Sequence, residues 1–265
     1  MPEKRKVFAA VKGHAFDRNA FEAMLRACGA EPTIVDQPAA STMIANGLVD
    51  DYDAVVLHDM WGLDFRAPRE ARPAPIEPDT ALVRGWGRLL EKGIGVIALH
   101  HAIASWPSWE GYAQMLGGRF LYRDAVLGGT LRQDSGYLPD ARYEAAVADH
   151  PVTQGLPPRF ALDDELYAME YLDAPGTEPL LTLASEIENS RFISAKNAVR
   201  RIDGAAWSPP SRSPLLGWAK TAGNSRVVYL QPGDSAATFE DPNYRTLVTN
   251  ALAWTTALAR QPPST

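Results

Sequence analysis

The sequence has a single cysteine, Cys28, among its 265 residues, so no disulfide can form within the chain. It also lacks an apolar run approaching the roughly 20 residues of a membrane span. Positive charge is outnumbered, since 26 Lys and Arg stand against 32 Asp and Glu and give a net charge of −6. This balance argues against nucleic acid or an anionic membrane as the main partner. The first residues are basic but lead into a strand rather than an apolar block, so we expect a cytoplasmic protein.

What the chain does have is apolar residues in a regular rhythm. They make up 46% of the sequence, enough for a sizeable core in one large α/β domain. Apolar runs alternate with amphipathic stretches, which predicts an α/β fold with a doubly wound, mainly parallel sheet. We expect strands over 6–11, 33–35, 52–57, 95–99 and 226–230, and helices over 17–28, over 79–92 and from Pro242, with Asp17, Asp79 and Asp241 as N-caps.

The alternation of apolar runs with amphipathic stretches ends after two successive glycines, Gly117 and Gly118. Residues 119–200 offer short strands and turns without a clear helix, which indicates a β-rich excursion from the sheet. No repeat or break in composition divides the chain. We therefore expect a single domain over residues 1–265, with 119–200 as an insertion within it.

Histidines stand where the expected strands end. The most hydrophobic strand, 95–99, leads directly into His100 and His101, while the third strand ends in His58 and the first in His14. Because the carboxyl ends of parallel strands lie on one edge of a sheet, we expect these rings to meet there. Imidazole titrates near neutral pH and ligates metals, so this edge is a candidate reaction site. The sequence leaves open whether both rings of the pair face the pocket or whether one is packed and hydrogen-bonded.

Aromatic residues and a loop flank the same edge. Trp61 and Trp106 lie near expected loops. Tryptophan walls often line sites for sugars or flat ligands, although most tryptophans simply pack the core. Residues 62–78 are rich in Pro and Arg, and this loop either covers the pocket as a lid or acts as a solvated connector.

Three carboxylates, Asp163, Asp164 and Glu165, stand next to one another. A solvated turn is one interpretation, since adjacent like charges repel. The apolar residues on both sides favour the other interpretation, a strand with one acid turned inward. Glu165 is the expected acid, because a carboxyl facing an apolar flap has its pKa raised toward neutrality.

Several motifs stand in a fixed order along the chain. HHAIASW and LGGRF lie between Gly93 and Phe120, DHPVTQGL spans 149–156, DDELY spans 163–167, and RVVYLQPG, FEDPNY and NALAW follow. In this order they resemble the ThuA-like (trehalose utilisation) family, part of the class I glutamine amidotransferase-like superfamily. The resemblance covers most of the chain and implies a flavodoxin-like fold.

The resemblance also implies one function class and excludes another. Amidotransferases of that superfamily end the central strand in a cysteine nucleophile, whereas this chain has His100 or His101 there. Cys28 lies elsewhere, so cysteine-dependent glutaminase chemistry is excluded. The family name implies carbohydrate metabolism, through oxidised (keto) sugar intermediates of disaccharide breakdown. One departure is Gly233-Asp234, where relatives often carry Gly-His. Aspartate can accept hydrogen bonds or bind a metal, but it is no acid at neutral pH without a raised pKa.

Two hypotheses of different classes follow. The first is an enzyme that cleaves or rearranges a keto sugar or glycoside, with His100 or His101 as the base and Glu165 as the acid. The second is a non-catalytic protein that binds a carbohydrate metabolite. Replacing either histidine would then abolish binding, whereas an enzyme would lose turnover with little change in affinity. The residues expected to bind the substrate are His14, His58, Asp59, Trp61, Trp106, Tyr137 and Asp234.

A divalent metal is a candidate cofactor. His14, His58, one of the paired histidines and Glu165 are ligands that zinc or a similar ion accepts. A bound ion would polarise a sugar carbonyl or activate water. Hydrogen-bonded histidines without a metal are the alternative. The expected partner is a small sugar-derived molecule, and assembly into a homo-oligomer stays open.

Overall fold

A parallel sheet forms the centre of the computed structural model, which describes residues 4–172, 175–203, 206–209 and 213–257. Neighbouring strands in this part run in the order β16, β6, β3, β1 and β2, and all of these pairs are parallel. The bounds are β1 Arg5–Lys12, β2 Ala30–Asp36, β3 Ala54–Asp59, β6 Gly95–Leu99 and β16 Ser225–Leu230. The predicted parallel core is therefore confirmed. Strands β3 and β6 and most of β1 and β16 are buried on both faces, as their apolar sequences require, whereas the edge strand β2 is partly exposed.

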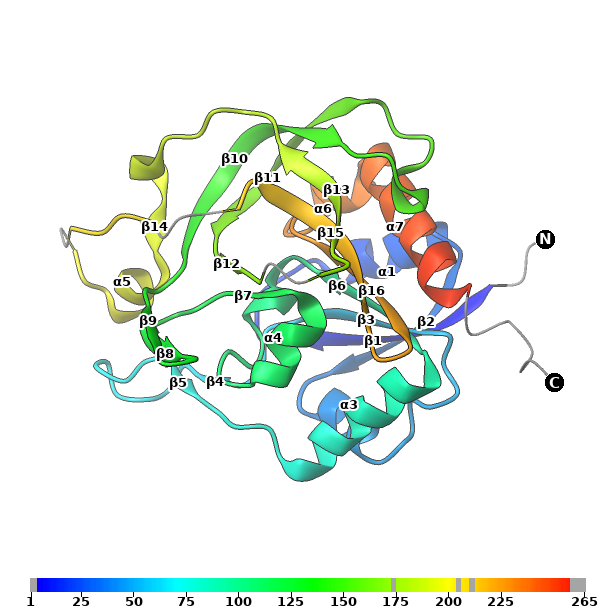
Figure 1. Cartoon of the computed structure of the whole chain (residues 1–265), viewed down its shortest axis with the longest axis horizontal. Helices are drawn as coiled ribbons and strands as arrows, with labels where there is room; N and C mark the ends of the chain where they lie inside the picture. The colour runs from blue at the N-terminus through cyan, green and yellow to red at the C-terminus, as the bar shows by residue number, and fades with distance from the viewer. Residues whose placement is uncertain (1–3, 173–174, 204–205, 210–212, 258–265) are drawn as a thin grey trace.

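The β-rich segment extends the same sheet with antiparallel strands beyond β16. The order on that side is β11, β10, β13 and β15, with a short β14 paired to β10. Their bounds are β10 Gly136–Val147, β11 Arg159–Ala168, β13 Glu178–Leu183, β14 Ile193–Ser194 and β15 Leu215–Ala222. Although β11 is the last strand of this extension, it contacts the loop that follows β16, so the extension folds back toward the parallel part of the sheet (Figure 1).

Short elements complete the β structure. The loop over 62–78 is largely irregular, as predicted, but contains one small strand pair. The pairs are β4 Leu63–Asp64 with β5 Ala74–Pro75, β7 Gly118–Arg119 with β12 Glu170–Tyr171, and β8 Ala125–Leu127 with β9 Thr130–Arg132. The expectation of no helix within 119–200 is wrong at its end, where α5 spans Ala195–Arg200. A helix this short is too brief for apolar periodicity to reveal it.

Helices cover both faces of the sheet. On one face lie α1 Arg18–Ala27, α6 Ala236–Glu240 and α7 Pro242–Thr256, and on the other lie α2 Ala39–Ala45, α3 Thr80–Lys92 and α4 Glu110–Leu116 (Figure 1). Short 3₁₀ turns occupy η1 His100–Ala104, η2 Pro151–Thr153 and η3 Asn189–Arg191. None of the helices in the described ranges is both long and apolar enough to cross a membrane.

The predicted helix starts are confirmed by their caps. The side chain of Asp17 accepts a hydrogen bond from the backbone of α1, Asp79 does so for α3, and Asp241 caps α7 ahead of the first-turn proline. Each cap satisfies backbone N–H groups that a helix start would otherwise leave without partners. The Asp17 cap also sets the length of the loop between β1 and α1, which carries His14.

Candidate active site

The ends of four neighbouring strands form one rim. The order β1, β3, β6, β16 brings together the loop after β1, the last residues of β3, the turn after β6 and the loop after β16. The ring centroids of His58 and His101 are 4.3 Å apart, those of His14 and His101 4.9 Å, and those of His100 and His101 5.4 Å. The four histidines at these strand ends therefore meet, as the argument from parallel strands predicted.

His100 stands at the sharp turn from β6 into η1. Its φ of +48° lies in the left-handed region that a non-glycine residue rarely adopts. The ring is fully buried, and its Nδ1 lies 2.7 Å from the carbonyl oxygen of Gln231. Since a carbonyl only accepts, Nδ1 carries a proton, and Nε2 is the nitrogen left to exchange one. The Tyr229 hydroxyl donates to the His100 carbonyl at 3.1 Å and holds the strained turn in place.

Two carboxylates and a phenol surround Nε2 of His100. It lies 3.2 Å from Glu165, 3.4 Å from Asp234 and 2.8 Å from the Tyr167 hydroxyl. Burial acts to lower the pKa of His100, but the hydrogen bonds to Asp234 and Glu165 outweigh it and raise the pKa to about 10. The hydrogen bond to His100 in turn lowers the pKa of Asp234, while burial, aided by Glu165, raises that of Tyr167. The raised pKa favours the charged imidazolium form of His100 at neutral pH, and the lowered pKa of Asp234 favours its carboxylate.

The other two buried rings are neutral. Burial lowers the pKa of His58 to about 3, and its Nε2–H donates to the Gly233 carbonyl at 2.9 Å. Burial and the neighbouring His58 lower the pKa of His101, whose Nε2–H donates to the His58 carbonyl at 3.3 Å. Both rings of the 100–101 pair are thus buried and hydrogen-bonded, and both belong to the same cluster. His58 stacks on Phe21 and supports the Gly233 backbone.

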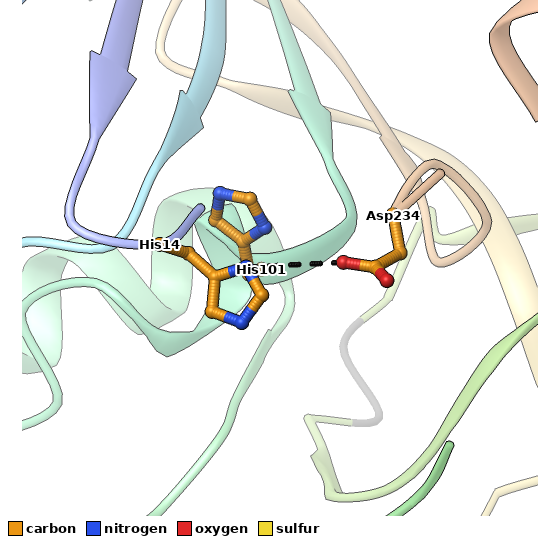
Figure 2. A group of neighbouring side chains, drawn as sticks. All are labelled: His14, His101 and Asp234. Carbon is orange, nitrogen blue, oxygen red and sulfur yellow. Dashed lines mark ion pairs between the residues drawn. The ribbon is translucent and has the colours of Figure 1, made fainter. Parts of the chain in front are cut away.

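Two glycines allow the loops at the rim to approach closely. Gly13 has a φ of +103°, and a Cβ there would lie 1.8 Å from the Met60 carbonyl oxygen. Gly233 has a φ of +134°, and its Cβ would lie 2.5 Å from the Tyr244 hydroxyl. The residue after each glycine faces the cluster. Figure 2 shows His14 and Asp234 reaching toward one another from these loops, with Nδ1 and Oδ1 3.8 Å apart.

Strand β11 supplies the acids from its two faces. Asp164 is 4% exposed and accepts from the backbone N–H of Gly233 at 2.7 Å and of Asp234 at 3.2 Å. It also accepts from the Thr238 hydroxyl at 2.6 Å, so it fixes the loop after β16. Side chains alternate along a strand, which puts Glu165 on the opposite face, against His100. The predicted strand is confirmed, and the acid that is fully buried is Asp164.

Two of the residues expected to bind the substrate lie outside this cluster. Asp59 is 2% exposed and accepts from the Gln37 side chain at 2.8 Å, because it points to the opposite face of β3 from His58. Trp106 is buried and packs edge-on against Trp109. Both side chains lie apart from the histidine cluster, so a contact of either with a substrate stays a prediction.

The remaining two aromatic candidates are half-buried. Trp61 lies beside Trp106, whose backbone N–H donates to the Trp61 carbonyl at 2.8 Å. Within the described residues no ring contact joins either tryptophan to a histidine of the cluster. Tyr137 is closer to the cluster, since it pairs across strands β10 and β11 with Tyr167, whose hydroxyl contacts His100. Burial together with the Glu165 charge raises the pKa of Tyr137. Tyr137 is therefore the aromatic residue of the predicted set that borders the cluster.

The burial of Asp59 predicts a pH-dependent stability. Burial raises the pKa of Asp59 to about 7, whereas an unfolded aspartate titrates near about 3.9. The folded state holds this proton more tightly, so the stabilising contribution is complete below about pH 4 and is lost as the pH rises through about 7, a change of roughly 4 kcal/mol. Asp59→Asn mimics the neutral acid. In urea unfolding at pH 4, 5.5 and 7, we expect the variant to gain stability relative to wild type as the pH rises. A difference that stays constant with pH would contradict this.

Sequence reasoning missed several residues that complete the cluster. The hydroxyl of Tyr167 lies against His100, and the side-chain oxygen of Gln231 accepts from the Tyr167 backbone N–H at 2.8 Å. The sequence does contain a signal for Tyr167. Positions 165 and 167 share one face of a strand, so Tyr167 is expected on the same face as Glu165. The run of acids indicates an inward-facing carboxylate without singling out Asp164, and no signal marks Gln231, because both contacts depend on how β11 folds back onto the loop after β16.

Ligand-type side chains form two groups that share Asp234. Within the described residues, the first consists of His14, His101 and Asp234, and the second of His100, Glu165 and Asp234. In each group the ligand atoms lie within 4.8 Å of one another. His58 belongs to neither.

Solved structures share this architecture. A ThuA-like protein from Parabacteroides merdae matches with a TM-score of 0.63 at 16% identity, over 96% of this chain and 90% of that one. A ThuA-like protein from Bacteroides uniformis matches with a TM-score of 0.61 at 18% identity, over 95% of this chain and 91% of that one. A GMP synthase subunit from Thermoplasma acidophilum matches with a TM-score of 0.50 at 10% identity, over 94% of this chain and 93% of that one. At these identities the likeness shows the fold alone.

The protein is therefore of the flavodoxin-like, class I glutamine amidotransferase-like fold, with histidine at the turn after its central strand. The profile of the trehalose utilisation family, ThuA, matches residues 7–255, and the chain belongs to that family. This membership places the protein in carbohydrate metabolism. No curated protein matches the sequence significantly.

Proposed function

We propose that this ThuA-family protein is an enzyme that cleaves or rearranges an oxidised (keto) sugar by acid–base catalysis. The observation that supports it is the contact of the His100 imidazole with Glu165 at 3.2 Å and Asp234 at 3.4 Å, on the edge of the sheet where α/β enzymes bind their ligands. Membership in the trehalose utilisation family supports a sugar-derived substrate, and the contacts of these groups support acid–base chemistry.

A keto sugar needs two proton transfers to lose a substituent. A base removes the proton from the carbon beside the carbonyl, and the electrons of that C–H bond form a C=C bond. The C–O bond at the next carbon breaks, and an acid gives its proton to the departing oxygen. Each well-placed acid or base contributes about 10²–10⁴-fold to the rate. Both transfers together need two groups within reach of one substrate.

Glu165 and His100 fit these roles. The Glu165 carboxylate, with 15% of its side chain exposed, takes the proton from carbon. The His100 imidazolium gives the Nε2 proton to the departing oxygen, since two neighbouring carboxylates favour its charged form. This assignment is the reverse of the one expected from the sequence, which has a histidine as the base and Glu165 as the acid. His14, Asp234 and Tyr137, all partly exposed, bind the sugar hydroxyls in this proposal.

Replacing the base tests the proposal. With trehalose oxidised to a ketone on one ring as substrate, Glu165→Gln is expected to lower kcat by about 10²–10⁴-fold and to change affinity only a few-fold. The matched control is Asp163→Asn, two positions away on the same strand with 73% of its side chain exposed. It should keep the wild-type kcat.

The same assay separates an enzyme from a binding protein. A wild-type protein that binds the oxidised disaccharide but releases no product over hours would favour the non-catalytic hypothesis. Equal activity of wild type and Glu165→Gln would exclude Glu165 as the base.

A further inference from the structure

We infer that His14, His101 and Asp234 form a binding site for one divalent transition-metal ion, with zinc as the best-suited probe. Their ligand atoms come from the loop after β1, the turn η1 after β6 and the loop after β16, and lie within 4.8 Å of one another (Figure 2). Two imidazoles and one carboxylate are a ligand set that zinc and related ions accept, with further positions left for water or substrate. Metal binding here does not depend on the proposed reaction.

His101 is the side chain that points to a ligand. It is 1% exposed, and its Nε2–H donates to the His58 carbonyl at 3.3 Å. The proton on Nε2 leaves a lone pair on Nδ1, and this buried nitrogen has no hydrogen-bond partner among the described residues. A backbone carbonyl that holds one ring nitrogen is the usual way in which proteins orient a metal-binding histidine. A metal ion would satisfy the nitrogen that is otherwise buried without a partner.

His14 and Asp234 form the open side of the site. Their side chains are 40% and 34% exposed, and His14 Nδ1 lies 3.8 Å from Asp234 Oδ1. The ring of His14 hydrogen-bonds the carbonyl of the adjacent Ala15 at 3.0 Å, a local and exposed contact that it can exchange for a metal without loss of buried packing. The Asp234 backbone is held by Asp164, so the carboxylate is already placed.

The second ligand-type group is a weaker metal site. His100 uses Nδ1 to bond Gln231, and its Nε2 already faces Tyr167 and Glu165. An ion there would have to displace these contacts. Asp234 belongs to both groups, so an ion held by His14 and His101 would stand directly beside the His100–Glu165 pair.

Zinc binding to the whole protein tests the site without any substrate. After removal of metals with a chelator, titration with zinc chloride followed by calorimetry and elemental analysis should show one ion per chain. His14→Ala and Asp234→Asn should each weaken zinc binding by at least the roughly 10–100-fold that loss of a supporting residue costs. Glu165→Gln and the control Asp163→Asn should bind zinc as wild type does. His14 is on an exposed loop, so circular dichroism of His14→Ala should match wild type.

Two outcomes would overturn the inference. One is wild-type protein that binds neither zinc nor manganese with micromolar affinity. The other is zinc binding that survives His14→Ala but is lost in Glu165→Gln, which would move the ion to the second group. The first outcome leaves the acid–base proposal standing, because that proposal is measured by turnover of the oxidised disaccharide. The second would occupy His100 and Glu165 with the ion and so argue against their roles as acid and base.

Discussion

Replacement of His100 by glutamine is expected to lower kcat on an oxidised disaccharide by about 10²–10⁴-fold, with the substrate dissociation constant changed only a few-fold. Glutamine has a similar reach, and its amide can still donate to the Gln231 carbonyl that holds the histidine ring at 2.7 Å. It cannot transfer a proton. Single-turnover rates measured beside equilibrium binding separate the loss of chemistry from a loss of affinity.

The control for this substitution is the histidine that lies outside the rim. His150 accepts from the Val152 backbone N–H and packs against Trp254, with ring centroids 5.1 Å apart. His150→Asn keeps a side-chain acceptor for the turn and should leave kcat unchanged. If His100→Gln retains kcat within a few-fold of wild type while Glu165→Gln loses it, His100 is not the proton donor.

The sequence predicts the histidine rim because that argument needs only strand direction. His14, His58 and His100 each lie at the end of an apolar run, and parallel strands end on one edge. What the sequence does not contain is strand order. The position of β16 beside β6 brings Asp234 to within 3.4 Å of His100, although the two residues are far apart along the chain. The sequence points to Asp234 only through a departure from a motif, with no geometric reason for its place.

The acids show where local patterns stop being informative. The run Asp163 to Glu165 indicates a strand with an acid turned inward, and the structure has that strand. Two acids, on opposite faces, have different roles: Asp164 holds a loop and Glu165 contacts His100. Because side chains alternate along a strand, the sequence places Asp164 and Glu165 on opposite faces of β11. Which of the two faces meets the histidine rim depends on how β11 folds back. The same alternation explains why Asp59, next to His58, points away from the site.

Asp164→Asn is expected to destabilise the protein by about 1–3 kcal/mol and to lower activity, although the Asp164 side chain is not itself proposed to bind the substrate. Its carboxylate accepts from Gly233 at 2.7 Å, from Asp234 at 3.2 Å and from Thr238 at 2.6 Å. An amide offers one oxygen and one NH₂ group, so at least one buried donor faces another donor. The loop that carries Asp234 then loses its anchor.

Urea unfolding and kcat measured on the same samples check this prediction. Asp163→Asn, one residue earlier and 73% exposed, should stay within about 0.5 kcal/mol of wild type. Because Asp164 acts by placing Asp234, its loss should also weaken zinc binding at the His14–His101–Asp234 site, which a change in stability alone would not do. Wild-type zinc affinity and kcat in a destabilised Asp164→Asn protein would mean that Asp164 stabilises the fold without positioning Asp234.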